Sequence, residues 1–130
     1  MSMLQTAKNL DKNKYNPLII FTESGPMVDL SLNAGLKTKV VPLKSIFFYG
    51  EHVKISIRML IKYLINYHST LKNTIKLIKE EKPDLVYLNT IVLIPVAIGV
   101  KNTKIPLLWH IREVPGPINL IRNWQLKKIK

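Results

Sequence analysis

The chain of 130 residues contains no cysteine, few acidic side chains and little glycine. The absence of cysteine excludes a disulfide scaffold, a zinc site with thiolate ligands and a thiol nucleophile. With five glycines and none before Gly25, the sequence also contains no glycine-rich phosphate-binding loop. Apolar residues make up 47% and charged residues 22%, a balance typical of a folded chain. We therefore predict a single domain spanning residues 1–130.

Long apolar runs are also missing. The longest apolar stretch, residues 91–100, is about half the ~20 residues that a membrane-spanning helix needs, and Pro95 interrupts it. The first eight residues contain neither a long apolar run nor a basic segment before one, so they do not resemble a signal peptide. We predict a cytoplasmic protein, either free or peripheral on the inner face of the cell membrane.

The charge is strongly one-sided. Twenty Lys and Arg against eight Asp and Glu give a formal net charge of +12. Only three of the basic residues are arginine, which is the side chain suited to two-point binding of phosphate and guanine. This ratio argues against nucleic acid as a partner. The surplus of lysine is then either a compositional bias toward lysine, isoleucine and asparagine, or a means of attraction to an anionic membrane surface.

Short apolar segments alternate with helical patterns along the chain. The apolar segments lack the period-two alternation of half-buried strands, which indicates parallel strands covered on both faces. The predicted fold class is therefore α/β, with a Rossmann-like doubly wound parallel sheet. We expect strands at 17–21, 38–41, 84–89 and 105–110, and helices at 2–11, between Pro26 and Gly35, at 53–80, at 94–101 and from Pro117 onward.

The helix expected at 53–80 is amphipathic. Its apolar residues repeat at spacings of three and four: Val53, Ile57, Leu60, Leu64, Leu71, Ile75 and Ile78. Basic residues fall on a neighbouring arc, and Ile61 and Ile65 lie inside that arc. Basic side chains mixed with exposed apolar ones are typical of an interfacial membrane site, whereas a purely basic stripe is usually a solvated surface. The residues predicted to face a membrane are Lys54, Arg58, Ile61, Lys62, Ile65, Lys72 and Lys76.

Aromatic and histidine residues of the same helix have simpler interpretations. Tyr63 and Tyr67 are four residues apart and are expected to pack as an aromatic pair, with a membrane-interface belt as the alternative. His52 and His68 have no partner ligands at metal-binding spacing. We therefore predict no metal site, and we expect His68 to edge the apolar face of the helix. Trp124 is expected to pack within the last helix.

Polar side chains follow the last two predicted strands. Asn89 and Thr90 leave one strand, and His110, Arg112 and Glu113 leave the other. Because the carboxyl ends of parallel strands meet at one edge of a sheet, we expect both segments to line one crevice. There a histidine can act as general acid or base or donate to a sugar hydroxyl, and arginine can bind phosphate. The alternative is that His110 caps its strand and Arg112 pairs with Glu113 on the surface.

The segments 83–90 and 104–113 resemble the amino-terminal domain of family 4 glycosyltransferases, which are GT-B enzymes. The most specific element is Trp109-His110-Ile111-Arg112-Glu113. The segments 2–10, 15–21 and 25–41 match the earlier part of that domain in order, so the resemblance covers nearly the whole chain.

The resemblance implies transfer of a sugar from a nucleotide sugar to a glycan or lipid-linked acceptor, in cell-surface polysaccharide or glycolipid synthesis. It implies that His110 is the catalytic residue that faces the donor sugar. Asn89 and Thr90 would lie on the acceptor side of the cleft, and Arg112 and Glu113 would complete the substrate-binding set. No cofactor is expected.

Two parts of the family pattern are missing from the sequence. The family begins with a strand and a glycine-rich loop, and that strand would be central in the sheet, between the strands at 17–21 and 84–89. The nucleotide-binding carboxyl-terminal domain, with its acidic E-x7-E pattern, is also missing. We therefore expect a fragment of a glycosyltransferase that is inactive alone.

Two alternatives from other functional classes remain. One is the non-catalytic acceptor- and membrane-binding half of a split enzyme, whose donor half is a separate chain. The other is a basic α/β module that binds nucleic acid, for which a steep dependence of binding on salt would be the sign.

Overall fold

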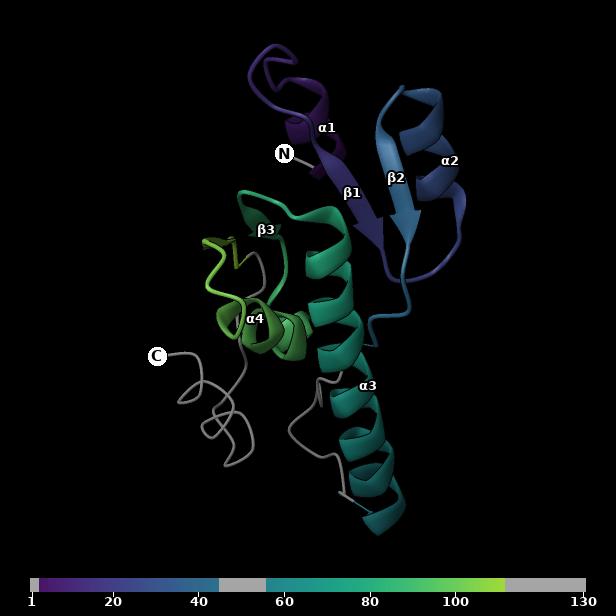
Figure 1. Cartoon of the computed structure of the whole chain (residues 1–130). Coiled ribbons are helices and arrows are strands. Elements are labelled where there is room, and N and C mark those ends of the chain that lie inside the picture. The colour runs from purple at the N-terminus through teal and green to yellow at the C-terminus, as the bar shows by residue number, and fades with distance from the viewer. Residues whose placement is uncertain (1–2, 45–55, 112–130) are drawn as a thin grey trace. The chain divides into compact units, whose positions relative to one another are not determined.

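The computed structural model describes residues 3–44 and 56–111, apart from the side chain of Ile91. The chain divides into two compact units, Met1–Pro42 and Leu43–Lys130. Along the sequence the elements are α1 (Met3–Lys8), β1 (Leu18–Phe21), α2 (Pro26–Asn33), β2 (Lys37–Val40), α3 (Ile57–Glu81), β3 (Val86–Leu88), the 3-10 helix η1 (Ile91–Leu93), α4 (Ile94–Lys101) and β4 (Leu107–Trp109) (Figure 1). The α/β class is therefore confirmed.

The first unit is a parallel strand pair with its connecting helix. β1 and β2 pair with Leu18 opposite Lys37, and α2 connects them. The boundaries of α2 follow the sequence, because Pro26 lies in its first turn and Gly35 follows its end at φ 69°. The small core of this unit contains Ala7, Ile19 and Leu36, with Met3, Leu4, Phe21 and Ala34 packed against them.

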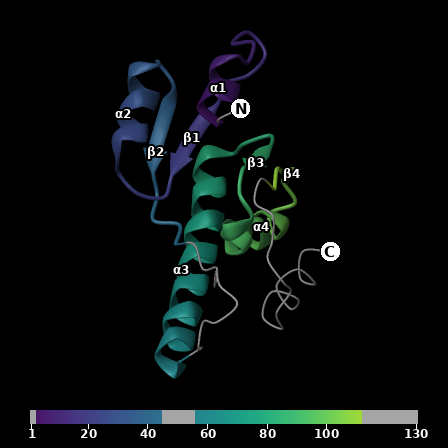
Figure 2. The ribbon, with the colours of Figure 1, turned by 180° about the vertical axis from the view of Figure 1, so that it is seen from behind.

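The second unit contains the other parallel pair. β3 and β4 pair with Leu88 opposite Trp109, and η1 and α4 form the connection between them. Figure 2 shows the two strands beside α4. Every residue of α4 from Ile94 to Val100 is buried, which agrees with its uniformly apolar sequence.

The four strands of the described residues form two separate pairs, β1–β2 and β3–β4. Parallel pairing is confirmed, and one continuous doubly wound sheet is not shown by the residues 3–44 and 56–111. In the predicted strand order, β1 and β3 would each border a central strand. Within 3–44 and 56–111 the structure contains no such strand.

α3 begins and ends at local signals. The hydroxyl of Ser56 accepts a hydrogen bond from the Met59 amide at 3.3 Å, which is an N-cap. At the other end Lys82 adopts the left-handed conformation at φ 47°, and Pro83 follows it. The predicted helix is therefore confirmed over Ile57–Glu81. Residues 53–55 and the helix predicted from Pro117 lie outside the described residues.

The buried face of α3 is not the predicted apolar stripe. Its buried residues are Tyr63, Tyr67, Thr70, Thr74 and Ile78. Ile57 is 79% exposed and Leu64 is 49% exposed. Of the stripe, Ile78 is buried, whereas the stripe's members nearer the start of the helix face solvent.

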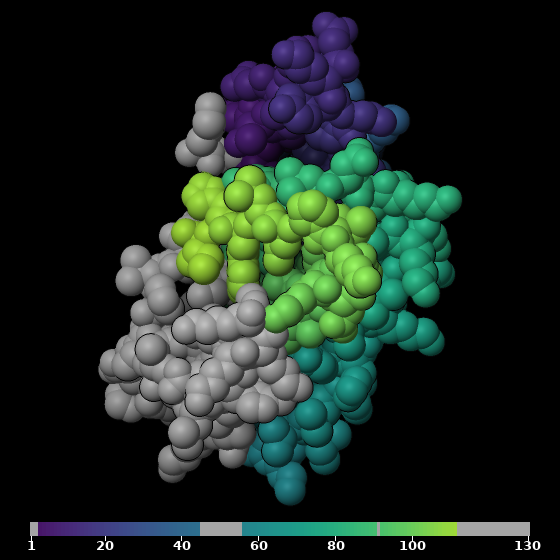
Figure 3. Space-filling view, turned by 60° about the vertical axis from the view of Figure 1, so that its left-hand side comes forward, coloured from purple at the N-terminus to yellow at the C-terminus, as the bar shows by residue number. Residues whose placement is uncertain are grey.

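The packing of α4 against α3 explains why the threonine side of α3 is buried. α4 packs directly against α3, as the adjoining green and teal surfaces in Figure 3 show. A Cβ atom added at Gly99 would lie 2.9 Å from Cγ2 of Thr74, so the helices meet where both side chains are small. The Thr74 hydroxyl donates to the Thr70 carbonyl at 2.8 Å, which satisfies it inside the contact. This close contact turns the threonine side of α3 inward.

Candidate functional site

The carboxyl ends of β3 and β4 bring two predicted site segments together. The His110 amide donates a hydrogen bond to the Leu88 carbonyl at 2.8 Å. His110 therefore lies beside the end of β3, where Asn89 and Thr90 follow. The pairing is parallel, and both segments therefore emerge at the same edge. The structure therefore places Asn89, Thr90 and His110 at one edge of the strand pair, while a crevice lined by both segments stays a prediction.

Trp109 and Thr90 fix the shape of this edge. The indole N–H of Trp109 donates to the Thr90 carbonyl at 2.8 Å, which ties the segment after β3 to the last residue of β4. The ring of Trp109 also packs against the core cluster that contains Tyr63 and Ile94. The Thr90 hydroxyl accepts from the Val92 amide at 3.3 Å and caps η1. Thr90 therefore has a structural role at this edge.

Tyr87 joins His110 on the outer face of the strand pair. Side chains alternate along a strand, so Leu88 and Trp109 face the core while Tyr87 and His110 share the opposite face. The Tyr87 hydroxyl and Nδ1 of His110 are 2.7 Å apart. Their ring centroids lie 6.2 Å apart with the planes tilted by 37°. Tyr87 is 37% exposed, so the pair is accessible to solvent.

The sequence pattern did not identify Tyr87 as part of the site. Tyr87 lies two residues before Asn89, within the predicted strand, where an aromatic residue is expected to pack in the core. Only the register between β3 and β4 places it diagonally across from His110, a distance that long aromatic side chains span.

The side chains available at this edge are polar. The imidazole of His110 can form hydrogen bonds with ligand hydroxyls, and the half-buried amide of Asn89 offers both a donor and an acceptor, while the Tyr87 hydroxyl is engaged with His110. Arg112 and Glu113, predicted as neighbours, lie outside the described residues. We name the group formed by Tyr87, Asn89, Thr90 and His110 the β3–β4 edge.

A second candidate surface lies at the start of α3. We name residues 57–65 the α3 tip. It exposes Ile57 (79%), Leu60 (41%), Ile61 (54%), Leu64 (49%) and Ile65 (64%), and its cations Arg58 and Lys62 are exposed as well. In Figures 1 and 2 this part of α3 extends beyond α4. Ile61, Ile65, Arg58 and Lys62 therefore share one exposed stretch, as predicted.

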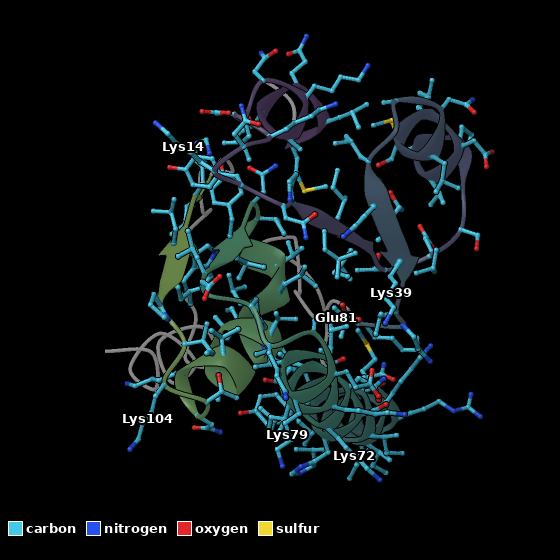
Figure 4. The ribbon with its side chains drawn as sticks, turned by 45° about the horizontal axis from the view of Figure 1, so that its top comes forward. Lys14, Lys39, Lys72, Lys79, Glu81 and Lys104 are labelled. Atoms are coloured by element: carbon cyan, nitrogen blue, oxygen red, sulfur yellow. The ribbon has the colours of Figure 1, made fainter. Side chains whose placement is uncertain are left out.

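Two other predicted membrane-facing residues lie elsewhere on the helix. Lys72 and Lys76 are exposed on the second half of α3, where Lys76 forms an ion pair with Glu80 at 3.7 Å. Figure 4 shows Lys72 and Lys79 pointing away from the helix. Lys54 lies outside the described residues.

The tyrosine pair of α3 belongs to the core. Tyr63 and Tyr67 are 5% and 9% exposed and their rings stack at 6.1 Å, which confirms packing over a membrane belt. Burial raises the pKa of the Tyr67 hydroxyl, because the phenolate loses hydration. His68 is exposed and meets the ring of Tyr67 edge-on at 5.6 Å. His52 and Trp124 lie outside the described residues.

Neither a metal centre nor a membrane span is found in the part of the chain that the structure describes. No three His, Asp or Glu side chains within 3–44 and 56–111 gather closely enough to hold a metal ion. Among the described helices, none combines the length and the hydropathy needed to cross a bilayer. No protein-family model, curated protein or solved structure matches the chain.

Proposed function

We propose that this chain supplies the acceptor-side domain of a glycosyltransferase, which moves a sugar from a nucleotide sugar to a glycan or lipid-linked acceptor. The observation that carries the proposal is the meeting of Asn89, Thr90 and His110 at the carboxyl edge of two paired parallel strands. In open α/β sheets this edge is where ligands bind. On this proposal the pairs β1–β2 and β3–β4 belong to one Rossmann-like sheet.

The residue types suit a sugar ligand. Sugar hydroxyls donate and accept, and a neutral imidazole and a carboxamide do both. His110 is the proposed catalytic residue, in contact with the reacting sugar, and Asn89 is the proposed acceptor-binding residue. Nucleotide binding needs a phosphate-binding loop or a comparable cluster, which the sequence does not contain, so we assign it to a donor domain outside these 130 residues.

Binding of glycans to the chain tests this proposal. Uniformly ¹³C,¹⁵N-labelled protein is titrated with maltotriose, chitotriose and mannotriose, and separately with UDP-glucose, while the amide of Asn89 and the ring signals of His110 are followed by NMR. We expect at least one trisaccharide to shift both sets of signals, and UDP-glucose to bind far more weakly.

Matched variants separate a specific site from general contact. His110→Ala and Asn89→Ala are expected to weaken trisaccharide binding by roughly tenfold each, the size of one or two lost hydrogen bonds in a bound complex. His68→Ala, which removes another exposed histidine, is the control and is expected to bind like the unaltered chain. Binding that none of these variants changes contradicts the site. Sugar transfer by the purified chain alone contradicts the assignment as a partial domain.

A second proposal concerns the α3 tip: it docks the chain on an anionic membrane surface. The observation that favours it is a helix segment with five exposed large apolar side chains next to Arg58 and Lys62. An exposed apolar helix face flanked by cations matches an interfacial helix, which buries its apolar side at the level of the headgroups. Each nearby cation adds up to about 1 kcal/mol of attraction to anionic lipid.

The lack of cysteine makes a direct test simple. Ile61→Cys and Glu80→Cys each place a single thiol, one on the α3 tip and one at the far end of the same helix. Each thiol is labelled with the environment-sensitive dye NBD and mixed with vesicles of phosphatidylcholine, alone or with about one-third phosphatidylglycerol. We expect a blue shift and a gain in intensity at position 61 with the anionic vesicles only.

The remaining outcomes identify different occupants of the α3 tip. A blue shift at position 61 without vesicles that grows with protein concentration indicates contact with a second copy of the chain and contradicts the membrane proposal. Equal signals at position 61 with both vesicle types contradict the electrostatic part of the membrane proposal. A shift at position 80 equal to that at position 61 contradicts docking through the tip.

A further inference from the structure

The ring of His110 is held by one side chain of the neighbouring strand. The Tyr87 hydroxyl lies 2.7 Å from Nδ1 of His110, which is within the ordinary range for a hydrogen bond that includes a hydroxyl. Among the described residues no partner is found for the other ring nitrogen, Nε2. The two ring nitrogens of His110 therefore have different surroundings.

The chemistry of the two groups sets the direction of this hydrogen bond. A phenol has one O–H to donate, and a neutral imidazole has one bare nitrogen to accept and one N–H to donate. Phenol is the more acidic partner, and the bare imidazole nitrogen is the stronger base, so donation from oxygen to nitrogen is the favoured arrangement. With Nδ1 accepting, the ring proton of neutral His110 is on Nε2.

We propose that Tyr87 is a positioning residue that holds neutral His110 in the Nε2–H tautomer, so that His110 meets its ligand as a hydrogen-bond donor. In this state Nε2 donates to a sugar oxygen and cannot accept a proton. His110 then orients and polarises the sugar oxygen instead of acting as a general base through that nitrogen. The identity of the ligand rests on the proposed function, whereas the tautomer does not.

The site of Tyr87 supports a role through His110 over a role in the core. Its ring lies on the outer face of β3 and is 37% exposed, whereas its strand neighbour Leu88 is 6% exposed. The backbone positions of both partners are fixed independently, because the β3–β4 pairing continues through the His110 amide to the Leu88 carbonyl. Removing only the hydroxyl should therefore free the ring of His110 without disturbing the strands.

The tautomer is read directly by NMR. Long-range ¹H–¹⁵N correlation of the histidine rings distinguishes a protonated from a bare nitrogen, and the His110→Ala spectrum assigns the signals of His110. The spectra are recorded at a pH high enough that the ring signals no longer change. We expect Nε2–H to dominate in the unaltered chain, and the tautomer ratio to move about two- to tenfold toward Nδ1–H in Tyr87→Phe, which is what one hydrogen bond of ordinary net strength supplies.

Two references make the comparison specific. Tyr15→Phe removes an exposed tyrosine hydroxyl elsewhere and is expected to leave the His110 ratio unchanged. His68, whose contact with Tyr67 is through the ring edge, reports in the same spectra on any general effect. An unchanged His110 ratio in Tyr87→Phe, or a dominant Nδ1–H tautomer in the unaltered chain, overturns the proposal.

Trisaccharide binding by the same variant separates this inference from the proposed function. We expect Tyr87→Phe to weaken trisaccharide binding by about two- to tenfold, in step with the tautomer ratio, while His110→Ala weakens it further. Normal binding by Tyr87→Phe together with a shifted ratio overturns the donor role of His110. If the unaltered chain binds no trisaccharide but the tautomer ratio responds to Tyr87→Phe, the proposed function fails and the tautomer assignment stands.

Discussion

The two halves of α3 contain similar apolar and basic residues but lie in different surroundings. In the second half, Ile78 is 7% exposed, and Thr70 and Thr74 are 0% and 2% exposed, with Thr74 packed directly against Gly99 of α4. In the first half, α4 covers only the side that contains Tyr63 and Tyr67, whereas Ile61 and Ile65 are 54% and 64% exposed. The presence of a packing partner therefore decides which apolar residues are buried, and periodicity alone does not. Substitutions in the two halves should accordingly have different consequences, in stability for the packed half and in binding for the exposed one.

Replacing Gly99 with a larger residue should disrupt the packing of α4 against the second half of α3. Any Cβ at this position meets Thr74 Cγ2 at 2.9 Å and Cβ at 3.0 Å, so Gly99→Val forces the two helices apart. We expect a loss of about 2 kcal/mol in the free energy of unfolding, measured by urea denaturation and circular dichroism. Lys101→Val, on the exposed side of the same helix, is the control and should change stability by less than about 0.5 kcal/mol. Equal stability of the two variants would contradict the close helix contact.

Polar substitutions at the α3 tip should remove membrane binding without loss of stability. Each of the substitutions Ile61→Ser and Ile65→Ser is expected to weaken the free energy of partitioning into the membrane by about 1 kcal/mol. The double variant should therefore bind anionic vesicles about 30-fold more weakly. Vesicle flotation measures this. The control, Leu30→Ser with Leu32→Ser, removes comparable exposed apolar surface from α2. If the control weakens binding as much, the docking surface is not the tip.

Removal of positive charge should weaken membrane binding more in the first half of α3 than in the second. Arg58→Gln with Lys62→Gln is expected to lower binding to anionic vesicles about tenfold, since these cations flank the apolar tip. Lys72→Gln with Lys76→Gln removes the same charge and should lower binding no more than about threefold, because distance and salt screen it and Glu80 already pairs with Lys76. The measurement is vesicle co-sedimentation at two salt concentrations. Equal losses would indicate that net charge alone drives binding.

The smallest expected effect is on the free energy of unfolding at alkaline pH. Burial raises the folded-state pKa of Tyr67 above the ordinary value of 10.0 for tyrosine. The unfolded chain therefore loses this proton first. Stability from the neutral phenol is complete below about pH 10 and declines as pH rises from the unfolded pKa to the folded pKa. Urea unfolding across this range should show a shallower decline for Tyr67→Phe, with Tyr15→Phe as the exposed control. Identical slopes for all three proteins would contradict the effect of burial.

Local signals in the sequence placed most of the elements. Pro26 and Gly35 bound α2, Pro95 lies in the first turn of α4, and Lys82-Pro83 closes α3. These signals act through steric limits on single residues, so they work without knowledge of the rest of the fold. Three of the predicted strands were longer than those observed, because pairing with the partner strand ends before the apolar run does, whereas the strand predicted at 38–41 has the predicted length and lies one residue earlier, at Lys37–Val40.

Chain connectivity and backbone sterics account for the alternation of helices and strands, the parallel pairing, and the presence of Asn89, Thr90 and His110 after two strands. All of these features could be predicted from the order of the amino acids. Three others became visible in the folded chain alone: Tyr87 forms a hydrogen bond with His110, the threonine side of α3 faces the core, and Ile57, Leu60 and Leu64 of the α3 tip are exposed. Each of these depends on strand register or on where another helix packs, and such long-range contacts leave no periodic pattern in the sequence.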